Sequence, residues 1–140
     1  MSTPKPSPMN PNVKVVEDAF AAFACRDLKT VLNLLSDDIE WQGARTQEIP
    51  YGGHFHGKAE IEKFFKTLGQ YIEYEYFETS EYVSHNERVI AFGRERFIVR
   101  ATGRHVDNEW AMSLIIRHGK IAHFRVYEDT AAVVAGFKPA

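Results

Sequence analysis

The sequence predicts an α+β domain in which helices come first and an antiparallel sheet follows. Apolar residues recur at steps of three and four positions up to about residue 35 and again over 57–68, which indicates amphipathic helices. After Tyr71, runs rich in Tyr, Phe, Val and Ile are separated by short turn signals, which is typical of strands that pair antiparallel. The four expected strands span 72–84, 88–101, 106–117 and 120–128.

The first helix is expected from residue 13 to about Arg26, with Asn12 as its cap, and Asp27 is expected to cap a second short helix. The pair Asp37-Asp38 should end this second helix, before a short strand over 39–41 and a polar loop over 43–48. The stretch 49–56, IPYGGHFH, is interpreted as a turn and a link. A third helix should begin at Gly57 and bury the apolar face formed by Ile61, Phe64, Phe65 and Leu68.

Length and composition favour one domain over residues 13–140, preceded by a proline-rich, disordered arm over 1–12. The net charge of −2 disfavours binding to nucleic acid. No run of about eighteen apolar residues predicts a membrane span, and the single cysteine, Cys25, allows no internal disulfide. We therefore expect a cytoplasmic protein that associates with neither nucleic acid nor membrane.

Several segments together resemble a known family. They are LLSDDIEW over 34–41, PYGG over 50–53 followed by Gly57, ATGR over 101–104, HGKI over 118–121 and FRVYEDT over 124–130. Their order and spacing resemble the SnoaL-like, ketosteroid isomerase-like branch of the nuclear transport factor 2-like (NTF2-like) superfamily. The resemblance implies a strongly curved antiparallel sheet wrapped around helices as a cone with an internal pocket. It also implies a homodimer.

The resemblance further implies a cofactor-independent enzyme of the cyclase or isomerase type, which applies acid–base chemistry to a hydrophobic carbonyl compound. The alternative is a non-catalytic module that binds a ligand or another protein, because fold does not imply function. The absence of a carboxylate at Gln42-Gly43, where ketosteroid isomerases of this superfamily place their base, favours this alternative.

Asp129 matches the aspartate that serves as acid and base in the cyclases of this family. Alternation along the last strand puts Asp129 on one face with His123, Arg125 and Tyr127, and this face would line the pocket if it points inward. His105, from a neighbouring strand, is the candidate partner of Asp129. The competing interpretation is that Asp129 caps a short helix over 131–135.

Seven further residues are candidates for substrate binding: Trp41, Tyr51, His54, His56, Trp110, Arg125 and Tyr127. Trp41 and Trp110 fit a plain core role at least as well. His54 and His56 could chelate a metal, but no further ligand motif accompanies them, so we expect no metal and place them at the pocket rim. Glu95, between two arginines, is interpreted as part of a charge cluster on the outer face of the sheet.

Overall fold

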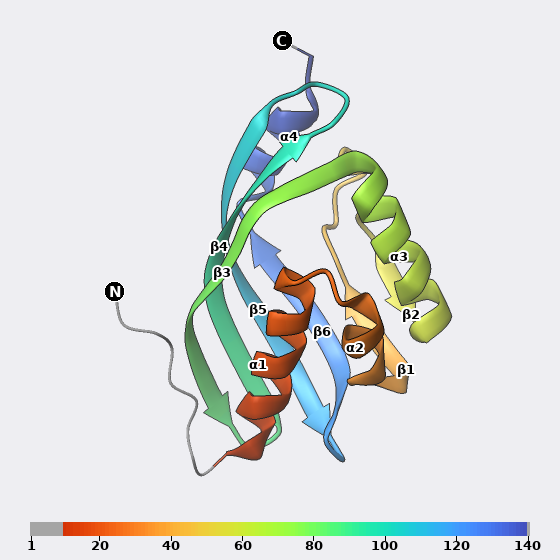
Figure 1. Cartoon of the computed structure of the whole chain (residues 1–140), viewed down its shortest axis with the longest axis vertical. Coiled ribbons are helices and arrows are strands. Elements are labelled where there is room, and N and C mark those ends of the chain that lie inside the picture. The colour runs from red at the N-terminus through yellow and green to blue at the C-terminus, as the bar shows by residue number, and fades with distance from the viewer. Residues whose placement is uncertain (1–9, 140) are drawn as a thin grey trace.

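The computed structural model describes residues 10–139, in which a curved, unclosed sheet of six strands is covered by helices on one face (Figure 1). The helices are α1 (Pro11–Ala24), α2 (Leu28–Asn33), α3 (Lys58–Tyr71) and α4 (Thr130–Phe137). The strands are β1 (Leu35–Gln42), β2 (His54–His56), β3 (Ile72–His85), β4 (Arg88–Val99), β5 (His105–Arg117) and β6 (Lys120–Glu128). Their order in the sheet is β2-β1-β6-β5-β4-β3. The expected α+β architecture is therefore confirmed.

Three local predictions need correction. The sheet is mixed, because β1 runs parallel to β6 while every other pair is antiparallel. The link over 49–56 contains a strand, β2, that is too short for an alternating pattern to reveal it. Asp37 and Asp38 lie within β1 rather than ending α2.

Polar caps explain where the first two helices begin. The side chain of Asn10 accepts a hydrogen bond of 3.0 Å from the Asn12 N–H, and Pro11 opens α1, so Asn12 is not the cap. Asp27 caps α2 as expected, accepting from the Thr30 N–H at 3.2 Å. Most of the predicted arm lies outside the described residues.

The two faces of the sheet differ sharply along β4. Alternate residues Val89, Ala91, Glu95, Phe97 and Val99 are buried against the helices and form the inner face, while the residues between them face outward. In the same inner row, a Cβ atom at Gly93 would overlap the carbonyl oxygen of Glu78 and the ring of Trp110. Only glycine therefore lets Trp110 of β5 lie across β4.

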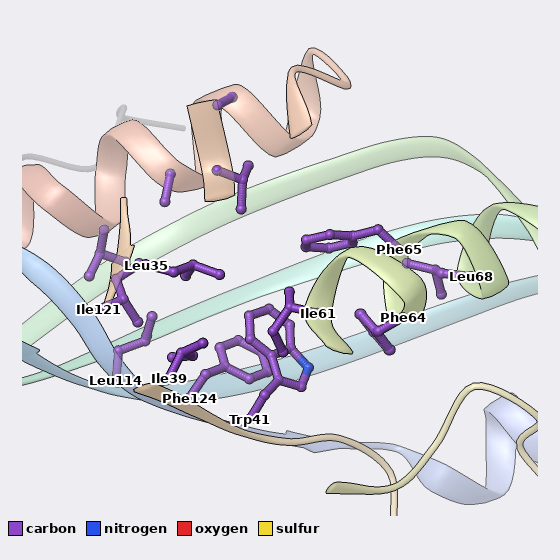
Figure 2. Close-up of a cluster of buried hydrophobic side chains, with 14 of the residues drawn as sticks. Leu35, Ile39, Trp41, Ile61, Phe64, Phe65, Leu68, Leu114, Ile121 and Phe124 are labelled. Carbon is purple, nitrogen blue, oxygen red and sulfur yellow. The ribbon is translucent and has the colours of Figure 1, made fainter. Parts of the chain in front are cut away.

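Aromatic side chains fill the space between the sheet and α3 (Figure 2). Trp41 of β1 stacks on Phe124 of β6, with ring centroids 3.8 Å apart and planes at 17°. From α3, Phe64 and Phe65 lie 5.5 and 5.8 Å from the Trp41 ring. The cluster fixes α3 over the end of the sheet where β1 and β6 run side by side.

Among the helices formed by residues 10–139, none is long and apolar enough to cross a membrane.

Candidate active site

A cavity of about 100 Å³ lies between the inner face of the sheet and helices α1 and α3. Most of its wall is aliphatic and aromatic, and polar groups enter it at few points. Within residues 10–139, the titratable side chains that line it are Tyr51, Tyr74, Glu95 and Glu128. An apolar cavity with a few converging polar groups is the usual form of a small-molecule site.

Glu95 and Glu128 are joined by one amide. The Nδ2 group of Asn108 donates to Glu95 Oε2 at 2.9 Å and to Glu128 Oε1 at 3.0 Å. The Asn108 Oδ1 atom in turn accepts from the backbone N–H of Asp129 at 3.1 Å, which orients the amide. Glu95 and Asn108 are only 7% and 3% exposed, so the bonds are shielded from water. Strand register brings the three together, because Glu95 pairs with Asn108 and Glu128 pairs with Trp110, two positions further along β5.

Burial makes both carboxyls weaker acids than an exposed glutamate. Loss of hydration raises the pKa of Glu95 to about 8, while the hydrogen bond from Asn108 lowers it and the negative charge of Glu128 adds to the rise. Burial also raises the pKa of Glu128, against the same stabilising amide. At neutral pH, Glu95 therefore holds its proton and can donate it.

Hydrogen-bond donors complete the cavity. Burial raises the pKa of the Tyr51 and Tyr74 hydroxyls, and the nearby negative charges of Glu95 and Glu128 add to the shift, so both phenols stay protonated. The Trp41 Nε1–H is buried and has no acceptor among residues 10–139. A buried donor without an acceptor is uncommon in a folded protein.

The structure brings two of the predicted binding residues to the cavity. Trp41 reaches it from β1 and Tyr51 from the loop after that strand. Trp110 lies one layer behind, stacked on the cavity residue Phe77 with ring centroids 4.9 Å apart, and is 4% exposed. The core interpretation of Trp110 therefore fits better than a place in the cavity wall.

The last strand presents the opposite face from the one expected. Phe124, Val126 and Glu128 line the cavity, because a register shift near Ile121 sets the alternation of β6 against β5. Arg125 and Tyr127 consequently face outward, with the guanidinium of Arg125 4.5 Å from the centre of the Tyr127 ring. This corrects their expected place in the pocket.

Asp129 is also absent from the cavity wall. Its side chain accepts a 3.1 Å hydrogen bond from the Ala132 N–H and caps α4, which is the competing interpretation given above. The neighbouring Glu128 occupies the position in the cavity that had been expected for Asp129.

The three histidines predicted for the site also lie elsewhere. His105 faces outward and approaches Glu75, with 2.5 Å between Nδ1 and Oε1. His54 and His56 flank the outward-facing Glu40, at 2.7 and 2.6 Å from its carboxylate oxygens. They therefore contact a carboxylate on β1 and do not line the cavity. In residues 10–139, no three His, Cys, Asp or Glu side chains are grouped as metal ligands would be.

Three cavity residues escaped prediction, Tyr74, Glu95 and Glu128, and so did Asn108, which donates to both carboxyls from behind the cavity wall. The signal for Glu95 was its place in the small and apolar row of β4, opposite the row that holds Arg94 and Arg96. Asn108 and Trp110 alternate with exposed residues in the same way on β5. A polar residue within the otherwise apolar, inward-facing row of a strand was therefore the sequence feature that indicates the site.

The comparisons with known proteins agree with this architecture. A family model described as a SnoaL-like domain matches residues 16–124. An NTF2-like protein from Burkholderia xenovorans is 30% identical, with a TM-score of 0.81, over 91% of this chain and 95% of that one. An NTF2-like protein of unknown function from Burkholderia pseudomallei is 25% identical, with a TM-score of 0.86, over 93% and 99%. A search of curated proteins finds no match. The chain therefore belongs to the SnoaL-like family of the NTF2-like superfamily.

Proposed function

We propose that this protein is a cofactor-independent enzyme that moves protons on a hydrophobic carbonyl compound held in the cavity. The observation that supports this most directly is a buried pair of carboxyls, Glu95 and Glu128, at the wall of an apolar cavity. Carboxyls whose acidity is tuned by burial are a common means of acid–base catalysis near neutral pH.

The two carboxyls are assigned complementary roles. Glu128, as the carboxylate, takes a proton from the carbon next to the carbonyl, and the C–H electron pair forms the C=C bond of an enol. The carbonyl π electrons move to oxygen, which receives the proton of Glu95. Where the substrate has a β,γ double bond the enol is a dienol, and return of the proton from Glu128 to its γ carbon shifts the double bond while the enol proton returns to Glu95, which is isomerisation. Attack of the α carbon of the enol on a second carbonyl within the same molecule gives ring closure.

Asn108 positions both carboxyls without exchanging protons itself. Its amide donates to each of them and is itself fixed by the Asp129 N–H. The Trp41 Nε1–H and the hydroxyls of Tyr51 and Tyr74 are the donors that would orient a substrate oxygen. Preorganised donors of this kind stabilise charge that develops in a transition state.

Hydrogen–deuterium exchange tests this chemistry directly. Acetophenone in D₂O exchanges its methyl protons through the enol, and ¹H NMR follows their loss. We expect the wild-type protein to accelerate exchange and Glu95→Gln or Glu128→Gln to lower the rate by about 10²-fold or more. The control is Glu109→Gln, an exposed carboxyl on the outer face of β5. Exchange at the wild-type rate in both cavity variants would refute the assignment.

A second candidate is a binding protein without turnover. The nearly continuous aromatic and aliphatic wall of the cavity favours it, because such a surface retains an apolar ligand whether or not chemistry follows. Acetophenone that binds but does not exchange faster than in buffer would select this alternative.

We also propose that the protein forms a homodimer through the outer face of the sheet. Phe92, Ala111 and Tyr127 lie in register on three neighbouring strands, and Phe92 and Tyr127 are 39% and 50% exposed. An apolar row across a sheet favours burial against a second copy of the same row.

A further inference from the structure

A second hollow adjoins the cavity. This outer groove, about 310 Å³ in volume, lies between the end of α1, the end of α3 and the start of β3. Ala24 and Leu28 line one side of it, Gly69 another and Tyr76 a third, and none of these four lines the inner cavity.

The groove and the cavity share one wall. Phe23, Phe65, Leu68, Tyr74 and Phe77 line both hollows. Phe23 stands at the centre of this partition, with its ring centroid 5.1 Å from that of Phe77, 5.4 Å from Tyr74 and 5.9 Å from Phe65. Packed aromatic side chains thus stand between the two hollows. A change of rotamer at Phe23, whose side chain is partly exposed, is the movement that would open a passage between them.

The charges around the groove are balanced. Arg26 and Arg100 face it, and so do Glu73 and Glu75. Arg100 donates to the Gly69 carbonyl at 3.0 Å and lies 3.9 Å from Glu73, while Glu75 contacts Arg96 and His105. The aromatic side chains therefore determine what the groove prefers, and an uncharged aromatic group suits it better than an ionic one.

We propose that the outer groove is a second subsite, which binds the distal ring of a two-ring, uncharged aromatic ketone while its carbonyl end lies in the cavity. The inference rests on the proposed function, because it takes the cavity as the place where the carbonyl is held. Pockets that enclose drug-sized ligands measure about 300–1,000 Å³. The cavity alone lies below this range, and the groove supplies the missing room.

The test compares two ketones. Acetophenone has one ring, and 1,3-diphenylpropan-1-one carries a second ring on a flexible tether that can pass the partition. Quenching of tryptophan fluorescence reports binding, since Trp41 lines the cavity. We expect the two-ring ketone to bind the wild-type protein at least about tenfold more tightly, as burial of a phenyl ring predicts.

Variants that fill the groove remove this advantage. Gly69→Phe places a ring in the groove from the α3 side, where an added Cβ would meet nothing within 4 Å. Ala24→Phe places a ring in it from the α1 side. Each should bring the two-ring ketone to within about threefold of acetophenone, whose own affinity should change by less than about twofold. The matched control, Gly69→Ala, adds helix propensity without filling the groove and should keep the preference.

The outcomes separate the subsite from the proposed function. Equal affinity for the two ketones in the wild type would overturn the subsite, and so would a preference that survives both filling variants. If acetophenone fails to bind while the two-ring ketone binds and the filling variants abolish that binding, the groove stands and the carbonyl-binding cavity falls. If neither ketone binds, both ideas are wrong.

Discussion

Glu95 changes its affinity for protons when the chain folds. In the unfolded chain its carboxyl ionises at an ordinary pKa near 4.5, whereas burial in the native state raises the pKa to about 8. The native state therefore binds more protons than the unfolded state between these two values, so this group stabilises the fold at low pH and loses that contribution as the pH rises.

Stability should consequently fall from about pH 5 to about pH 9, with Glu95 contributing a few kcal/mol at about 1.4 kcal/mol per unit of pKa. Glu128 adds to the same trend, because its pKa is also raised. Glu95→Gln keeps an acceptor for Asn108 but does not titrate, so its free energy of unfolding should depend less on pH. Urea unfolding at both ends of the range checks this. A variant as pH-dependent as the wild type would contradict the assignment.

Asn108 is expected to matter for stability as well as position. Asn108→Ala leaves two buried carboxyls without their shared donor, and each unsatisfied group costs about 1–3 kcal/mol. The denaturation midpoint should drop accordingly, more at high pH than at low pH, because the ionised carboxyls need the donor most. An equal drop at all pH values would indicate a packing effect alone.

Single strands show what the sequence could reveal about the site and what it could not. The alternation on β4 places Glu95 in the buried row, so its inward orientation was predictable from neighbours alone. On β6, a register shift near Ile121 puts Ile121 and Phe124 on one face, so alternation counted from Ile121 and alternation counted from Phe124 disagree about the inner row. The same ambiguity exchanged the expected places of Glu128 and Asp129.

At the start of α4, the sequence-based and structural assignments of Asp129 predict different results. Asp129→Asn preserves an N-cap, because asparagine caps about as well as aspartate, so exchange activity and melting temperature should stay near those of the wild type. Asp129→Ala should cost about 1 kcal/mol of stability and leave most activity. Loss of acetophenone exchange in a fully folded Asp129→Asn protein would restore Asp129 as the proton carrier.

On β4, Gly93 is expected to tolerate no side chain. Gly93→Ala would push a methyl group into the Glu78 carbonyl and the Trp110 ring, and overpacking of this kind costs about 1–3 kcal/mol or more. Thermal unfolding followed by circular dichroism measures the loss. Gly69→Ala is the control, since its site is open and helical, and it should be neutral or stabilising.

Across the whole molecule, most of the fold could be predicted from the hydrophobic periodicity and the resemblance to the family. The order of helices and strands followed from periodicity, and the curved sheet with an internal cavity followed from the resemblance. The parallel pairing of β1 with β6 did not, because β2, α3 and three strands separate the two in sequence. Alternation within a strand specifies its buried face but never its neighbour.

Assembly through the outer face can be measured in solution. Light scattering should give the mass of a dimer for the wild type, and Phe92→Lys, which places a charge within the apolar row, should shift the equilibrium toward monomer. Gln70→Lys adds the same charge at an exposed position of α3 and should leave the mass unchanged. A monomeric wild type, or a dimer indifferent to the Phe92 change, would rule this interface out.

The hydrogen bonds at Asp129 link the start of α4 to the buried carboxyl and amide groups beside the cavity. Its side chain anchors the first turn of α4, and its backbone N–H holds the amide that lowers the proton affinity of Glu95. If the last helix came loose, that amide would turn freely and the carboxyl would bind its proton more tightly still. The pKa of Glu95 thus also reports whether α4 is packed in its native position.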